Sequence, residues 1–147
     1  MIEAMDRKLV RALNANARKS YREIAKELGT STTAVIRGIK KLEASGAISA
    51  YIPVVDPAAF GFDLTVVVSL RINQGRLLEA QRQIARDPHV ALVLDITGEW
   101  DSLIVAHFRG REELNAFLKK INGMKQVART VTHIVLNSIK DERRLAV

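Results

Sequence analysis

The chain has 147 residues, of which 48% are hydrophobic and 27% charged, an ordinary composition for one globular domain or two small ones. It contains no cysteine, which excludes disulfides, cysteine-ligated metals and a thiol nucleophile. No run of 18 apolar residues is present, and the N-terminus lacks an apolar signal segment. We therefore expect a soluble, cytoplasmic protein with no membrane partner.

Basic charge is concentrated near the N-terminus. The chain carries 23 Lys and Arg against 16 Asp and Glu, a net charge of +7. Residues 7–41 hold ten of the basic residues and only two acidic ones, so this stretch carries +8 and the rest of the chain −1. Solvated helical surfaces usually mix both signs. The segregation therefore favours a polyanionic partner, most often a nucleic acid.

The first third of the chain has the pattern of three helices. Met5, Leu9 and Leu13 recur every four residues and predict an amphipathic helix over 5–16. Ser20, with Glu three residues later, forms a capping box that begins a second, short helix. Gly29 ends that helix, because glycine adopts a positive φ without a Cβ clash.

The third helix has features of a DNA-recognition helix. Ser31 is its predicted N-cap, a buried stripe follows at Val35, Ile39 and Leu42, and Gly46 ends it. A short helix, a glycine turn and a longer helix are typical of a helix-turn-helix, whose second helix brings hydroxyls to base edges and cations to phosphates. The candidate DNA-binding residues are Ser31, Thr32, Thr33, Arg37, Lys40 and Lys41, with Tyr21 and Arg22 from the preceding helix.

The remainder alternates between strand and helix patterns. Strand-forming residues over 47–55, then Pro57 and Gly61, predict a linker strand over 51–63. Strands are predicted over 64–73, 90–97, 103–109 and 127–139, and helices over 76–86 and 111–122. The order βαββαβ is that of a ferredoxin-like domain. We expect an α+β protein with a winged helix-turn-helix over 1–50, the linker strand, and a ferredoxin-like domain over 64–147.

Residues for catalysis or metal binding form no recognisable constellation. The three histidines, His89, His107 and His133, lack the spacing of a ligand set, and neither a nucleophile motif nor a glycine-rich phosphate loop is present. Glu99 and Asp101 could act as an acid–base pair, but such a pair is commonplace in a solvated hairpin. We therefore expect no enzyme, no metal site and no cofactor.

The turn at 98–101 contains the only tryptophan in the chain. Backbone amides near Gly98 could bind a carboxylate, Asp101 could pair with an ammonium group, and Trp100 could cover an apolar side chain. The turn would then bind a small amino acid. Alternatively, Trp100 packs on a neighbouring subunit, and the two interpretations do not exclude each other.

Taken in order, these features resemble the Lrp/AsnC family of transcription regulators. The resemblance covers nearly the whole chain; no single match is specific, but the ordered set is. The matching residues are Asp6, Leu9, Ala17-Arg18, Glu23-Ile24-Ala25, Leu28-Gly29, Ser31, Val35, Leu42-Glu43, Gly46-Ala47-Ile48, Tyr51, Val55-Asp56-Pro57, Gly61, Thr97 to Asp101, Glu112-Glu113-Leu114, Thr130-Val131-Thr132 and Ile134-Val135-Leu136.

The resemblance implies a regulator that binds double-stranded DNA and forms homodimers, which assemble into tetramers or octamers. It also implies a small effector, typically an amino acid, bound between dimers near Gly98, Glu99, Trp100 and Asp101, with Thr130 and Thr132 completing the pocket. The chain departs from the family at Gly38, where an arginine usually precedes the isoleucine of the recognition helix. Two alternatives share the architecture: a siroheme-decarboxylase-like enzyme, and an amino-acid-binding module without DNA contact.

Overall fold

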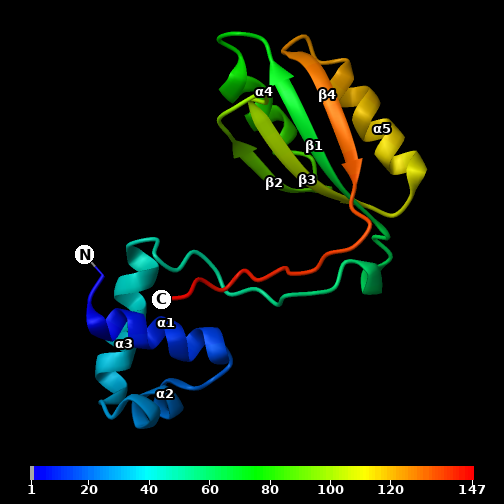
Figure 1. Cartoon of the computed structure of the whole chain (residues 1–147). Helices are drawn as coiled ribbons and strands as arrows, with labels where there is room; N and C mark the ends of the chain where they lie inside the picture. Colours follow the sequence, from blue (N-terminus) through cyan, green and yellow to red (C-terminus); the bar gives the residue numbers. More distant parts are fainter. Residues whose placement is uncertain (1) are drawn as a thin grey trace. The chain divides into compact units, whose positions relative to one another are not determined.

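A computed structural model of the chain describes residues 2–147 and divides them into two compact units (Figure 1). The helical unit comprises the residues up to Val54 together with the C-terminal segment Asp141–Val147. The sheet unit comprises Val55–Lys140. The C-terminal segment lies against the first helix, where the Asn14 side chain donates a hydrogen bond to the Leu145 carbonyl, 3.2 Å away.

The helical unit consists of α1 (Ala4–Ala15), α2 (Tyr21–Leu28) and α3 (Thr32–Ala44). The predicted capping box is confirmed: the Ser20 hydroxyl accepts from the Glu23 amide at 3.2 Å, and the Glu23 carboxylate accepts from the Ser20 amide at 2.7 Å. Gly29 ends α2 with a φ of +62°. The core of this unit is formed by Leu9, Ala12, Leu13, Ile24, Ala25, Val35, Ile39 and Leu42.

One predicted core position of α1 is wrong. Met5 is exposed, and the neighbouring Asp6 is buried in its place. The reason is electrostatic, since Asp6 receives hydrogen bonds from a backbone amide and from a lysine of α3 that sequence periodicity does not reveal.

The segment after α3 contains no strand over residues 51–57, all of which are described. Its apolar side chains are exposed, with Ile52 and Val54 open to solvent over 66% and 71% of their surface. A strand needs a neighbour to pair with, and the four-stranded sheet formed within residues 2–147 does not include this segment. A short 3₁₀ helix, η1 (Ala58–Phe60), follows Pro57.

The sheet unit contains β1 (Leu64–Ile72), α4 (Leu77–Ile84), β2 (Val90–Asp95), β3 (Ser102–Phe108), α5 (Arg111–Asn122) and β4 (Val127–Ile134). The predicted βαββαβ order is confirmed, and the antiparallel sheet has the order β2-β3-β1-β4. β4 ends at Ile134, five residues before the predicted boundary, although the Val135 amide still donates to the Thr65 carbonyl at 2.8 Å. Since β1 begins at Leu64, the register leaves residues 137–139 without a partner on this strand.

Both helices of this unit pack on one face of the sheet. Alternate side chains of β1 and β3 are fully buried there against Ala80 and Ile84 of α4 and Phe117 of α5. The side chains between them, such as Val67 and Val105, belong to the opposite face. Neither α4 nor α5, the two helices of this unit, packs on that face, which we call the open sheet face.

Candidate DNA-binding and effector sites

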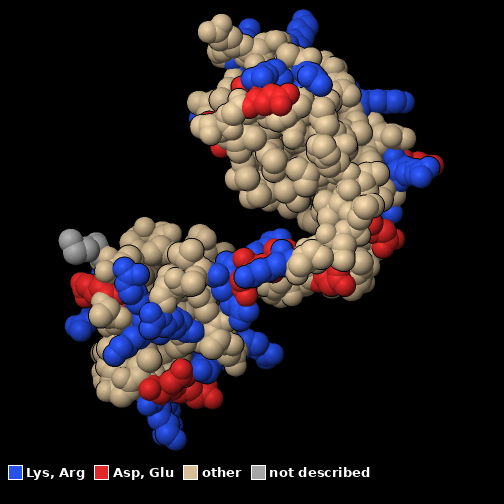
Figure 2. Space-filling view, viewed as in Figure 1, with Lys and Arg blue, Asp and Glu red and all other residues tan. Residues whose placement is uncertain are grey.

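The third helix presents the predicted recognition residues to solvent. The Ser31 hydroxyl accepts a hydrogen bond from the Ala34 amide at 3.1 Å and so begins α3 at the predicted position. Thr32 and Thr33 occupy the first turn of the helix, and both side chains are exposed. The exposed side chains of Arg37 and Lys40 follow. Figure 2 shows Lys and Arg side chains distributed over the surface of the helical unit.

The start of α2 supplies a second group of exposed polar side chains. Tyr21 and Arg22 lie in its first turn and are exposed, directly after the Ser20 cap. Hydrogen bonds from the hydroxyl and the amide of Ser20 lower the pKa of Glu23, so this carboxylate stays ionised and keeps the helix start ordered. The first helix of a helix-turn-helix crosses the DNA backbone, which makes Tyr21 and Arg22 suitable for phosphate contacts.

Lys41 differs from the other recognition-helix cations, because its ammonium group is bound within the protein. Its Nζ lies 3.1 Å from Glu3 Oε1 and 3.1 Å from Asp6 Oδ2. The same Asp6 oxygen accepts from the Glu3 amide at 2.9 Å. The backbone hydrogen bond and Lys41 together lower the pKa of Asp6. Lys41 therefore links α3 to the start of α1, a role that sequence reasoning missed because its partners are 35 and 38 residues away.

Gly38 lies where α3 packs against α1. A Cβ at this position would lie 2.5 Å from Cδ1 of Leu9, a side chain that is completely buried. Non-bonded carbon atoms are normally 3.5–4.0 Å apart. The departure from the family pattern thus has a structural reason, since the space that a side chain would need at this position is filled by Leu9.

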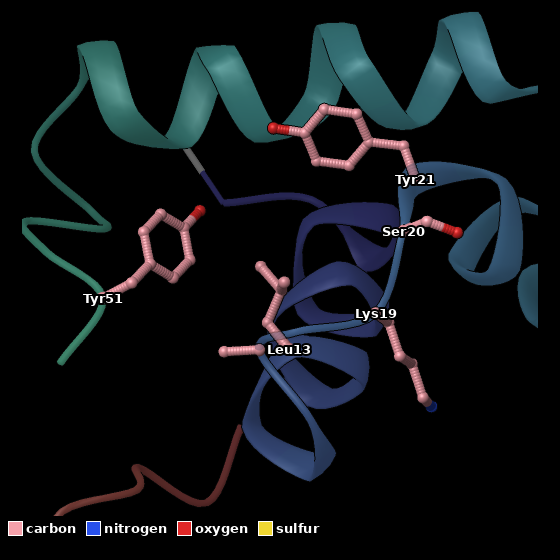
Figure 3. A pocket seen from close by; sticks show the side chains of 6 residues that line it. Leu13, Lys19, Ser20, Tyr21 and Tyr51 are labelled. Carbon is pink, nitrogen blue, oxygen red and sulfur yellow. The ribbon is translucent and has the colours of Figure 1, made fainter. Parts of the chain in front are cut away.

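A pocket of about 480 Å³ lies beside these elements in the helical unit (Figure 3). It is lined by Leu13, Ala17, Lys19, Ser20, Tyr21 and Tyr51. The Tyr51 hydroxyl donates to Glu43 Oε1 at 3.0 Å, and burial together with this carboxylate raises the pKa of Tyr51 to about 12. Sequence reasoning did not identify this pocket, because its lining comes from segments that are far apart in the chain.

The second candidate site is the turn between β2 and β3. Gly98 has a φ of +112°, a conformation that favours glycine. Asp101 follows it, and its Oδ2 accepts from the Ile72 amide at 2.8 Å, while Oδ1 lies 3.6 Å from the Arg71 guanidinium. The Asp101 carboxylate, which we expected to bind an effector ammonium, is thus held by the end of β1. Glu99 is exposed.

The other predicted effector residues divide between the two faces of the sheet. Trp100 lies beneath Arg129 of β4, whose guanidinium carbon is 5.2 Å from the centre of the indole ring. Thr130 and Thr132 pair with Leu70 and Val68, so they belong to the helix-covered face. Thr130 also donates to Asn122 Oδ1, at the end of α5, at 2.8 Å. These threonines therefore belong to the face opposite to that of Arg129, which contacts Trp100.

The histidines take part in separate local contacts. His89 Nδ1 lies 2.9 Å from Asp87 Oδ1, and His107 Nδ1 lies 2.9 Å from the Thr65 hydroxyl. Although burial opposes it, hydrogen bonds from Lys120 and His89 lower the pKa of Asp87. Over residues 2–147 there is no cluster of three or more side chains that could hold a metal ion. In the same range, no helix combines the length and apolar character needed to cross a membrane.

Two family models match the chain and between them cover most of it. The AsnC-type helix-turn-helix domain matches residues 2–43, and the Lrp/AsnC ligand binding domain matches residues 65–145. Among the relatives, an uncharacterised HTH-type transcriptional regulator of Pyrococcus horikoshii is 39% identical over 144 residues, which are 98% of this chain and 97% of that protein.

Solved structures share the fold over the full length. AsnC of Escherichia coli superposes with a TM-score of 0.87 at 24% identity, covering 97% of each chain. A transcriptional regulator of Neisseria meningitidis, solved as a complex with L-Met, superposes with a TM-score of 0.89 at 22% identity, covering 99% of this chain and 96% of that one.

Proposed function

Because the chain belongs to the Lrp/AsnC family of transcription regulators, we propose that it binds specific operator sites in the cytoplasm and that a small amino acid controls this binding. The observation that carries the proposal is the exposed face of α3. Thr32 and Thr33 lie near the capped N-terminus of this helix, and Arg37 and Lys40 follow. A helix in the major groove needs this order of short hydroxyls and longer cations.

The residues of α3 divide the recognition between bases and phosphates. Arg37 is suited to a bidentate pair with guanine, and a good pair discriminates against the wrong base by about 1–3 kcal/mol. Lys40 is suited to a phosphate contact, which adds affinity without sequence information. Lys41 contributes indirectly in this proposal, because its ammonium group is bound by Glu3 and Asp6.

The test is selection of genomic fragments by the purified protein, followed by binding measurements at several salt concentrations. About six phosphate contacts in a dimer would lower the affinity by on the order of 10³-fold between 50 and 200 mM salt. Lys40→Met should weaken binding to all fragments alike, whereas Arg37→Gln should relax sequence preference. Lys119→Met, an exposed lysine of α5, is the matched control. Affinity that does not respond to salt, or equal losses from Lys40→Met and Lys119→Met, would contradict the proposal.

The effector proposal rests on the turn at Gly98, Glu99, Trp100 and Asp101. Gly98 carries no side chain over the backbone of the turn, and outside the adjacent residues no atom lies within 4 Å of the position of an added Cβ. Trp100 is partly buried and supplies an apolar surface next to the backbone amides of the turn. A carboxylate at the amides and an apolar group on the indole match the two ends of a small amino acid. The Neisseria relative, with its L-Met complex, supports the same class of ligand.

The proposed assembly is a dimer formed through the open sheet face. Val67, Val105 and Val131 belong to this face, and each is only partly buried in the single chain. Pairing two such faces would remove apolar surface from water at about 25 cal/mol per Å². An effector that binds one oligomeric state more tightly than another shifts the population toward that state by the difference in binding free energy. The oligomeric state in turn sets the spacing of the recognition helices on DNA. Light scattering with and without amino acids tests both steps, and a monomer at micromolar concentration would contradict them.

A further inference from the structure

Two arginines lie side by side at the end of the open sheet face that is next to the effector turn. Arg71 of β1 and Arg129 of β4 are direct partners in the antiparallel ladder. Residues paired in this way project from the same face with their Cβ atoms about 5 Å apart, and like charges in this arrangement repel each other. Both side chains are exposed. Farther along the same face, Val131 pairs with Ser69 and Val67 pairs with His133.

Both guanidinium groups are directed to the turn. Arg71 Nη1 lies 3.6 Å from Asp101 Oδ1, and the Arg129 guanidinium lies over the Trp100 ring at 5.2 Å. Asp101 makes two interactions, because its other oxygen, Oδ2, accepts a hydrogen bond from the Ile72 amide at 2.8 Å. The Asp101 carboxylate, already hydrogen-bonded to the backbone, therefore lies against one of the two guanidinium groups, and the other lies over the indole ring of the same turn. Most of their N–H donors remain available to a ligand.

Building on the effector site of the proposed function, we propose that the effector is a small dicarboxylate, whose second carboxylate binds Arg71 and Arg129. Arginine forms two parallel hydrogen bonds with a carboxylate, and it does so with higher geometric specificity than lysine. A bound carboxylate would also relieve the repulsion between the two cations. The first carboxylate binds the backbone amides of the turn, and the carbon chain between them lies along Trp100.

Two sources share this dicarboxylate chemistry: an acidic amino acid, and the 2-oxo acid that carries a carbonyl in place of the amine. Glu99 distinguishes them. It is exposed in the same turn and is free to pair with an ammonium group of the ligand once Asp101 is held by β1. Loss of the Glu99 charge should weaken binding of an amino acid and leave binding of the 2-oxo acid unchanged.

The experiment uses the full chain and measures affinity by calorimetry, with Trp100 fluorescence as a second signal. The probes are L-aspartate, L-glutamate and 2-oxoglutarate, with L-asparagine and L-glutamine as neutral matches of the same shape. L-aspartate or L-glutamate should bind ten or more times tighter than its neutral match, or 2-oxoglutarate should bind ten or more times tighter than L-glutamine. Arg71→Met and Arg129→Met should each reduce this preference at least tenfold, whereas Arg82→Met, an exposed arginine of α4, should leave it unchanged.

Folding of the variants is checked by circular dichroism. Glu99→Gln then assigns the ligand. If aspartate or glutamate is the tightest ligand of the wild type and this variant weakens its binding, the effector is an amino acid. If 2-oxoglutarate is the tightest ligand and its binding is unchanged in the variant, the effector is an oxo acid. Equal affinity for acids and neutral matches, or a preference that survives both arginine variants, overturns the inference. If only a neutral amino acid binds, the inference fails and the effector proposal stands. Absence of salt-dependent DNA binding by the wild-type chain would instead refute the proposed function.

Discussion

Replacing Gly38 with alanine should destabilise the helical unit, although alanine is the better helix former. In the interior of an exposed helix this substitution stabilises by about 1 kcal/mol. At Gly38, however, the new Cβ would lie 2.5 Å from Leu9 Cδ1, about 1 Å inside normal contact. Leu9 is completely buried, so its methyl group cannot move without displacing its neighbours in the core.

The magnitude follows from two opposing contributions. An extra methyl group in a packed core costs about 1–3 kcal/mol, and the gain in helix propensity offsets about 1 kcal/mol of this. The expected net loss for Gly38→Ala is therefore about 1 kcal/mol. Leu9→Val removes the clashing methyl group at a cost of its own, since a buried CH₂ contributes about 0.8 kcal/mol before any cavity is counted. In that background the helix-propensity gain remains, and Gly38→Ala should stabilise by about 1 kcal/mol.

The assay is hydrogen exchange of the α1 and α3 amides in the full chain, which reports the stability of this unit separately from that of the sheet unit. A double-mutant cycle compares the wild type with Gly38→Ala, Leu9→Val and the double variant. Overpacking alone predicts a coupling free energy of about 1–3 kcal/mol between the two substitutions. The sign of the Gly38→Ala effect should reverse between the two backgrounds. If alanine stabilises both backgrounds equally, the close approach of α1 and α3 is not what requires glycine.

Four further outcomes are expected. The lowered pKa of Asp6 contributes stability above its unfolded-state pKa of about 3.9, and this stability is lost as the pH falls through the lower folded-state value. Asp6→Asn should therefore reduce the loss of helical-unit stability between neutral and acidic pH. An unchanged pH dependence would refute this role of Asp6. Lys41→Met should speed hydrogen exchange of the amides in the first turn of α1 at low salt, because Asp6 loses its ion pair. Unchanged exchange would instead mean that Lys41 acts only as a DNA contact. Asp101→Ala should destabilise the sheet unit by about 1 kcal/mol in unfolding followed by Trp100 fluorescence, because the Ile72 amide loses its acceptor. Val67→Lys should shift the oligomer toward monomer in light scattering without unfolding the sheet unit.

Local signals in the sequence were sufficient to predict the elements of both units. The Ser20 capping box, the Ser31 cap and the positive φ of Gly29 each depend on residues within four positions of one another. The helix Arg111–Asn122 has the predicted bounds, since acidic residues precede its apolar stripe and lysines follow it. Hydrophobic periodicity likewise predicted the βαββαβ order. The concentration of basic charge in residues 7–41 needed no structure at all.

The roles of individual site residues were decided only by tertiary contacts. Lys41 has the spacing of a phosphate contact, but a buried aspartate 35 residues earlier holds its ammonium group. Asp101 has the chemistry of an ammonium partner, but the end of β1 occupies its carboxylate. Arg71 and Arg129 carry no signal in the sequence, because 58 positions separate two residues that the β1–β4 register makes neighbours. Capping and periodicity act over a few residues and can be predicted from the sequence, whereas charge pairing and sheet register join distant positions and depend on the fold.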